Sequence, residues 1–224
     1  MQCKAGFTLL IFTLFFTLDI MIKHTLFAIT LFLSFTFIDH PLSAILIDNT
    51  HPQKWISLLS KLSLTLFQSI AWLAIFFIAI RRKSDRYITH SYSILGNLGI
   101  GIVISFILKV AIGRARPELA LSGGSLLFHP FHIKNYFHSM PSSHAISAFI
   151  ATGGLIRLFP KKKVFLITIG SIIALTRLFL FKHFLSDLVF GAWIAYWISN
   201  ASIIEMVKGW IWTKIKGLKF SIDP

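Results

Sequence analysis

The chain alternates between long apolar runs and short polar segments. Six of the runs approach the roughly 20 residues that an α-helix needs to cross a bilayer. They cover residues 21–38, 62–80, 94–112, 145–159, 164–181 and 184–204. Helix tilt and flanking side chains absorb a few ångströms of mismatch between a span and the bilayer. The pattern therefore predicts an all-α, polytopic membrane protein built as a bundle of six transmembrane helices.

The two ends of the chain differ from this core. Residues 1–20 form an apolar extension, which Lys23 and His24 separate from the run that follows. Two crossings before residue 39 would leave the second one too short to span. The extension is therefore an interfacial segment, a stretch upstream of a start at Met21, or a signal peptide without a clear small-residue cleavage site. We expect one membrane domain over residues 21–206 and a basic tail over residues 207–224 that binds anionic lipids of the inner leaflet.

Composition and charge support the membrane prediction. Of the 224 residues, 55% are hydrophobic and only 13% are charged, against about 25% charged residues in soluble domains. A net charge of +14 would suggest nucleic-acid binding in a soluble protein. Here the basic residues lie mainly after the second, fourth and sixth apolar runs, which predicts that these loops and both termini are cytoplasmic. Cys3 is the only cysteine, so an internal disulfide is excluded.

Polar side chains gather at the opposite ends of the predicted helices. Lys109 and Arg116 close the third run, and Arg177 lies near the end of the fifth. An ionised group near the hydrocarbon costs roughly 2.5–3.5 kcal/mol on insertion scales, so several at one depth indicate a function. Arginine binds phosphate in bidentate fashion, and lysine acts as a point charge. Snorkelling from helix ends is the simpler interpretation of each cation taken singly.

A second cluster comes directly before the fourth run, at Pro141-Ser142-Ser143-His144. Ser142 is a suitable N-cap, and the free N–H groups at a helix start bind anions. Ser143 follows in the first turn with His144, which we expect beside the bound anion. The alternative is that His144 only caps the helix.

A third cluster combines Arg177 with His183 and Asp187. A spacing of four residues places His183 and Asp187 on one helix face. A carboxylate that binds one imidazole nitrogen fixes the tautomer and leaves the other nitrogen free to attack phosphorus. A purely structural pair inside the bundle is the alternative.

Metal chemistry is not favoured by the sequence. The chain has eight acidic residues, and only Asp187 and Glu118 lie near the clusters, whereas two-metal phosphoryl transfer uses several carboxylates. His129, His132 and His138 share a loop, but their spacing fits no common zinc site. The sequence predicts a metal-independent reaction with no cofactor.

Taken together, the three clusters resemble the three signature motifs of the type 2 phosphatidic acid phosphatase (PAP2) superfamily. The motifs are Lys109-x6-Arg116-Pro117, Pro141-Ser142-Ser143-His144 and Arg177-x5-His183-x3-Asp187. The chain departs from the pattern at two positions, with Ser143 where glycine is usual and Thr176 where serine is usual.

The resemblance implies a role for each residue of the site. His183 would be the nucleophile that forms a phosphohistidine, Asp187 would orient it, and His144 would protonate the leaving group. The phosphate would be held by the remaining motif residues, namely Lys109, Arg116, Ser142, Ser143 and Arg177.

The resemblance also implies an activity and a place. We expect a lipid phosphatase of a bacterial inner membrane, with its active site on the periplasmic face, that acts on a phosphate monoester or terminal pyrophosphate. Lipid A is the first expected substrate, by analogy only, and undecaprenyl pyrophosphate or phosphatidylglycerophosphate are alternatives. A lipid-to-lipid phosphotransferase shares the same chemistry, whereas a transporter or non-catalytic scaffold would tolerate loss of His183.

Overall fold

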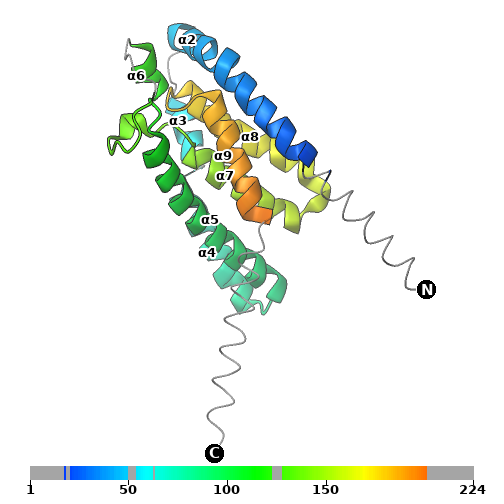
Figure 1. Ribbon diagram of the computed structural model, residues 1–224. Helices are drawn as coiled ribbons and strands as arrows, with labels where there is room; N and C mark the ends of the chain where they lie inside the picture. The colour runs from blue at the N-terminus through cyan, green and yellow to red at the C-terminus, as the bar shows by residue number, and fades with distance from the viewer. Residues whose placement is uncertain (1–17, 19–20, 50–53, 63, 123–127, 201–224) are drawn as a thin grey trace, which may run out of the picture.

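All regular elements in the described part of the chain are helices, and the one β-type contact is an isolated bridge between Arg114 and Phe128. The computed structural model describes residues 18, 21–49, 54–62, 64–122 and 128–200. Most of the predicted extension over residues 1–20 and all of the predicted tail over residues 207–224 lie outside these ranges. The all-α prediction is confirmed for the described residues (Figure 1).

Five helices follow the predicted apolar runs closely. They are α4 (Thr65–Arg81), α5 (Asp85–Ile112), α7 (Ser143–Leu158), α8 (Lys163–Phe179) and α9 (Leu185–Asn200). Shorter elements connect them, namely α3 (Lys54–Lys61), α6 (Pro117–Leu121), η2 (Asn135–Phe137) and η3 (Pro160–Lys162).

The number of membrane crossings stays a prediction. Two described helices, Met21–Asn49 and Tyr87–Ile112, are long and apolar enough to span a bilayer. The pair Lys54–Lys61 and Thr65–Arg81, bent by 48°, would make a third span if it crosses as one unit. With 16, 17 and 16 residues, α7, α8 and α9 are shorter than the roughly 20 residues of a full span. The helices of the predicted bundle are therefore present, and six crossings are not established.

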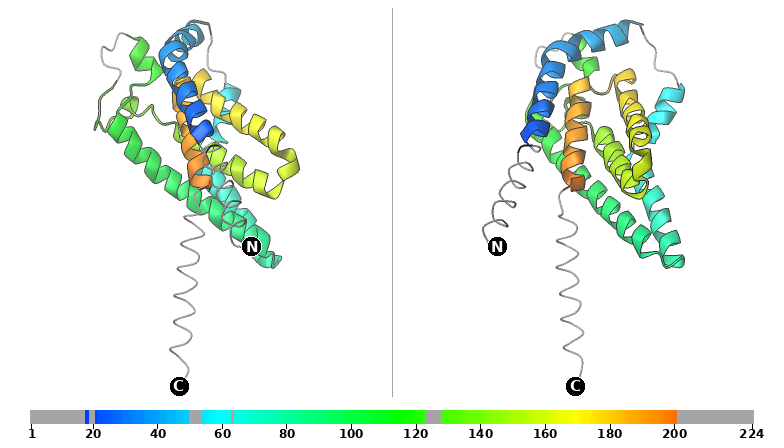
Figure 2. Two further views of the ribbon diagram at one scale, coloured as in Figure 1. Left: turned by 45° about the vertical axis from the view of Figure 1, so that its right-hand side comes forward. Right: turned by 90° about the vertical axis from the view of Figure 1, so that its right-hand side faces the viewer.

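The helix Met21–Asn49 contains a π-helical segment, η1 (Ser34–Ile38), followed directly by α2 (Asp39–Asn49). Figure 2 shows this helix climbing beside α9 and then turning across one end of the molecule. It contacts α9 through aromatic rings, because Phe27 stacks on Trp193 with ring centroids 4.5 Å apart. Most of the helix is exposed, but Ser34 and Asp39 are buried.

The core lies where α4, α5, α7 and α9 meet. Its buried members include Trp72 of α4, Leu98 of α5, Ile150 of α7 and Ile194 of α9. Gly191 allows a close approach between α7 and α9, because a Cβ atom there would lie 2.8 Å from the carbonyl oxygen of Ser142. This contact places the beginning of α9 against the beginning of α7.

The outer surface of the helices is strongly apolar. Large side chains on α4, α5 and α8 are more than half exposed, among them Phe77, Val103, Phe106 and Phe165. Soluble monomers rarely expose contiguous apolar patches of more than a few hundred Å². The helices therefore present the kind of surface that contacts lipid, which agrees with a membrane protein.

Candidate active site

The first motif begins where α5 ends. Gly113 terminates the helix in the left-handed conformation, with φ of 61°, and its N–H donates to the carbonyl of Lys109. A Cβ atom at this position would collide with the carbonyl oxygen of His129. Glycine is thus required both by the backbone conformation and by the close approach of the loop. The chain then runs through Arg114 and Arg116 to Pro117, the first residue of α6.

The second motif forms the beginning of α7. Ser142 is the N-cap, and its hydroxyl oxygen accepts from the N–H of Ala145 at 3.4 Å, as the sequence predicts. Its own N–H donates to the carbonyl of Asp187 at 3.1 Å. Ser142 is fully buried, and Ser143 and His144 follow it in the first turn, both partly exposed. The cap fixes the direction in which the helix start presents His144.

The third motif crosses the turn between α8 and α9. The Nδ1 atom of His183 lies 2.7 Å from the carbonyl oxygen of Ser139 and 3.7 Å from the nearer carboxylate oxygen of Asp187. The hydrogen bond therefore goes to the carbonyl, and the carboxylate acts on the ring through its charge. Either interaction keeps the proton on Nδ1, so Nε2 is the ring nitrogen with a lone pair for phosphorus.

The Asp187 carboxylate is occupied by other donors. One oxygen accepts from the hydroxyl of Ser139 at 2.5 Å and from the N–H of Phe184 at 2.9 Å. The other accepts from Arg114 at 2.6 Å. The bond to Phe184, which precedes α9, resembles a capping box and places a negative charge at the helix N-terminus. Asp187 thus builds the turn that carries His183.

Three cations from different parts of the chain act electrostatically on the two histidines. The charges of Lys109, Arg116 and Arg177 act on His144, as does the ring of His183. Lys109 donates to the carbonyl of His138 at 3.0 Å, and Arg177 donates to the hydroxyl of Ser60 at 2.8 Å.

None of these three cations forms an ion pair within the described part of the chain. The guanidinium of Arg116 also makes no hydrogen bond to the described residues, and the Nε atoms of Arg116 and Arg177 are buried without a partner there. The site therefore has an excess of positive charge and unused donors, which suits a dianionic phosphate.

Burial sets the protonation of the groups outside the spanning helices. It lowers the pKa of the His183 imidazole to about 4, with smaller lowering effects from Lys109 and Arg177, although Asp187 acts in the opposite direction. The imidazole is therefore neutral, and nucleophilic, at neutral pH. Burial also lowers the pKa of the Arg116 guanidinium, against the raising effects of Glu118 and Asp187.

Comparison with known proteins shows the family of this chain. The sequence profile described as PAP2 superfamily matches residues 90–210, more than half of the chain. The chain belongs to the PAP2 superfamily. The matched region begins within α5 and contains all three motifs of the candidate site. No solved structure matches the PAP2 chain described here.

Two curated relatives are similar over part of this PAP2 chain. The lipid A 1-phosphatase of Rhizobium johnstonii is 35% identical over 124 residues, which make up 54% of this chain and 47% of the relative. The lipid A 1-phosphatase of Rhizobium etli is 35% identical over the same length, covering 54% of this chain and 50% of the relative. This chain therefore spans about half the length of the curated relatives it matches.

One arginine of the first PAP2 motif has a role that the sequence did not indicate. Arg114 lies between Lys109 and Arg116 and is only 4% exposed. Its two terminal nitrogens bind Asp187 at 2.6 Å and Asp39 at 2.7 Å. The rings of Phe35 and Phe184 lie 4.9 Å and 4.2 Å from its guanidinium carbon. Arg114 thus supports the site through its bond to Asp187.

The histidines of the long loop serve its internal packing. His138 is buried, its Nε2 lies 2.8 Å from the carbonyl oxygen of His132, and His132 packs against Phe137. Among the described residues, no group of three or more histidine, cysteine, aspartate or glutamate side chains could hold a metal ion.

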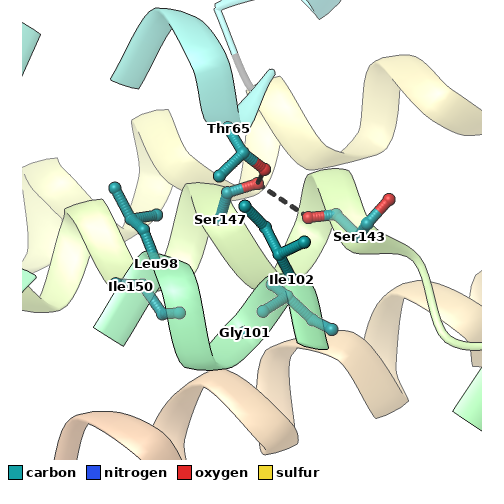
Figure 3. A pocket seen from close by; sticks show the side chains of 8 residues that line it. Thr65, Leu98, Gly101, Ile102, Ser143, Ser147 and Ile150 are labelled. Atoms are coloured by element: carbon teal, nitrogen blue, oxygen red, sulfur yellow. Dashed lines mark hydrogen bonds between the residues drawn. The ribbon is translucent and has the colours of Figure 1, made fainter. Parts of the chain in front are cut away.

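A small crevice opens beside Ser143, between α4, α5 and α7 (Figure 3). Its floor is apolar and includes Leu98, Ile102 and Ile150. Its polar wall is the chain of hydrogen bonds from Thr65 to the hydroxyl of Ser147 and on to the carbonyl of Ser143, at 3.1 and 2.7 Å. The crevice thus joins the second motif to the apolar flank of the protein.

Proposed function

We propose that this PAP2 protein removes a phosphate from a membrane lipid through a phosphohistidine on His183. The proposal rests on the electrostatic action of Lys109, Arg116 and Arg177 around two histidines, since these cations form no ion pair among the described residues. Such cations stabilise the charge of the transferring phosphoryl group, and this is usually the largest single contribution to a catalysed rate. A scaffold or transporter would have no evident use for the neutral imidazole of His183 beside them.

The proposed reaction has two steps. In the first, Nε2 of His183 attacks phosphorus, the bond from phosphorus to the lipid oxygen breaks, and His144 gives its proton to that oxygen. In the second, His144 takes a proton from water, whose oxygen attacks the phosphohistidine and releases inorganic phosphate with free His183. Lys109, Arg116, Arg177 and the N–H groups that follow the Ser142 cap hold the phosphoryl oxygens throughout.

The substrate proposed first is lipid A, because both curated relatives named above are lipid A 1-phosphatases. We place the acyl chain along the apolar flank next to the crevice beside Ser143, while the phosphate reaches His183; the crevice itself, with a volume of about 10 Å³, is too small to hold the chain. The same chemistry would serve a monoester such as phosphatidylglycerophosphate or the terminal phosphate of undecaprenyl pyrophosphate.

The test is phosphate release from each of these three lipids by the purified protein in detergent with EDTA. His183→Ala and His144→Ala are the decisive variants, and His40→Ala is the matched control, because His40 is exposed on α2. We expect release by wild type and His40→Ala and a loss of several orders of magnitude for the other two. A requirement for added divalent metal, or activity that survives His183→Ala, would contradict the proposal.

We also propose that the site faces the periplasm of a bacterial inner membrane. Phe131, near the site, and Val164, at the opposite end of α8 from Arg177, are 78% and 79% exposed. In a Cys3→Ser background, a membrane-impermeant maleimide applied to cells with a permeabilised outer membrane should label Phe131→Cys and spare Val164→Cys. The reverse pattern would place the site in the cytoplasm.

A further inference from the structure

Asp39 is a buried carboxylate outside the matched PAP2 region, and it contacts residues that support the candidate active site. Asp39 is 2% exposed, and it precedes the matched residues 90–210 by a long stretch of chain. It sits on a helix whose other side chains are mostly exposed. A buried charge is costly unless it is paired, so the environment of Asp39 shows what the residue does.

The hydrogen bonds of the Asp39 carboxylate are made with Ser186, which lies within the third motif, and with Arg114. One oxygen accepts from the backbone N–H of Ser186 at 3.0 Å. The other accepts from Arg114 at 2.7 Å and from the hydroxyl of Ser186. Ser186 is the neighbour of Asp187 in the first turn of α9. Asp39 therefore fixes the helix start that carries Asp187, and it fixes the arginine that pairs with Asp187.

The contacts continue without a break to the reacting ring. Arg114 binds one oxygen of Asp187 at 2.6 Å, and the other oxygen accepts from the hydroxyl of Ser139 at 2.5 Å. The carbonyl of Ser139 then accepts from Nδ1 of His183 at 2.7 Å. Four consecutive polar contacts thus join a carboxylate of the N-terminal helix to the imidazole.

The local helix geometry is also adapted to this contact. The π-helical segment Ser34–Ile38 ends directly before Asp39. A π-helical turn adds a residue per turn and is frequent at functional sites. It brings Phe35 to the guanidinium of Arg114 and Asp39 to the same group from the next turn. The N-terminal helix therefore holds Arg114 with an aromatic ring and a carboxylate.

We infer that Asp39 is a positioning residue of the phosphatase, which holds the His183 imidazole in line for attack through Arg114, Asp187 and Ser139. This inference rests on the proposed function. Asp39 has no contact with the phosphate-binding cations Lys109, Arg116 and Arg177 among the contacts described above. Its loss should therefore disturb the chemical step and leave substrate binding nearly intact.

The experiment compares Asp39→Asn with Asp48→Asn in the purified full-length protein, because Asp48 is an exposed carboxylate on the same helix α2. A misplacement of about 1 Å can cost a hundredfold in rate, so we expect kcat of Asp39→Asn to fall about 10- to 100-fold with KM changed by less than about twofold. Asp48→Asn should match wild type. Asp39→Asn with a wild-type kcat, or with a loss no larger than its loss of folded protein, would overturn the inference.

A double-mutant cycle tests the route of the effect. In an Arg114→Gln background, single-turnover rates should show a smaller further loss from Asp39→Asn than in the wild-type background, because the route through Arg114 is broken and only the route through Ser186 remains. A full additional loss would mean that Asp39 acts through overall stability, and the inference would fail.

Asp39→Glu keeps the charge but displaces it. This variant tests the positioning role of Asp39 if Asp39→Asn does not fold. We expect reduced kcat at a wild-type KM for Asp39→Glu, and an unchanged kcat would overturn the inference. If wild type itself releases no phosphate from any lipid, it is the proposed function that fails, and the two failures are thereby distinguished.

Discussion

Arg114 and Arg116 are two residues apart in one motif, yet they belong to regions of opposite character. Arg114 is buried between two carboxylates and two aromatic rings, and both of its terminal nitrogens are paired. Arg116 has no ion pair and no side-chain hydrogen bond within the described residues. The first region is a paired network that stabilises the fold, and the second is an unpaired group of cations suited to an anion. Charge in a membrane protein is thus used here in two ways, and pairing distinguishes them.

Removal of the buried arginine should give the largest effect on stability. Arg114→Gln leaves the carboxylates of Asp39 and Asp187 buried without their cation, and breaking a buried pair in this way costs about 3–5 kcal/mol. We expect a large fall in the thermal unfolding midpoint in detergent. A midpoint close to that of wild type would show that Arg114 is not part of a stabilising network.

The matched substitution two residues later should affect catalysis instead. Arg116→Gln removes a donor that we propose binds the phosphoryl group, and loss of similar donors from other enzymes costs about 10²–10³ in kcat. Its unfolding midpoint should stay near that of wild type, because the Arg116 side chain has no hydrogen-bond or ion-pair partner among the described residues. Loss of stability without loss of kcat would reverse the roles that we assign to the two arginines.

The dependence of stability on pH should reveal the buried imidazole. The pKa of His183 is lowered to about 4 in the folded protein, from an ordinary value of about 6.5. Between these values the unfolded chain binds a proton that the folded protein does not, so stability falls as pH falls, by up to about 1.4 kcal/mol per pH unit. His183→Gln should lose less stability than wild type from pH 6.5 to pH 4. Equal losses in both proteins would contradict a neutral, buried His183.

The smallest effect is expected in the crevice beside Ser143. Ile102 is half exposed at its lipid side, and Ile102→Trp would partly fill the route proposed for an acyl chain. We expect KM to rise by about tenfold for a long-chain lipid phosphate, which corresponds to about 1.4 kcal/mol of lost binding. KM for a short-chain, water-soluble phosphate should not change. If both substrates respond alike, the chain does not enter here.

The sequence predicted the elements better than the contacts between them. The apolar runs located α4, α5, α7, α8 and α9, because each helix is mainly apolar with polar residues near its ends, although α5 begins at Asp85, before its apolar run. The cap at Ser142 was also predictable, since a serine directly before an apolar run has a local function. These features depend on neighbours along the chain.

The paired network depends on contacts that no local pattern encodes. Asp39 directly follows the first apolar run, and an acid at such a position usually marks the water boundary. Only the packing of the N-terminal helix against α9 shows that Asp39 faces inward to Arg114. Ser139 was likewise missed, since its contribution to His183 is a backbone carbonyl and every residue has one. The one available signal was the scarcity of acids in the sequence, which makes each of them worth examining.

The reach of the N-terminal helix into this network has a practical consequence. A fragment cut at the start of the shared region, near residue 90, would keep every motif and still lose a counter-charge of Arg114. The Arg114 guanidinium would then pair with Asp187 alone. It would keep its contact with the ring of Phe184 and lose its contact with the ring of Phe35. The fragment would contain all three family motifs, but it would lack the residues of the N-terminal helix that hold Arg114 beside Asp187.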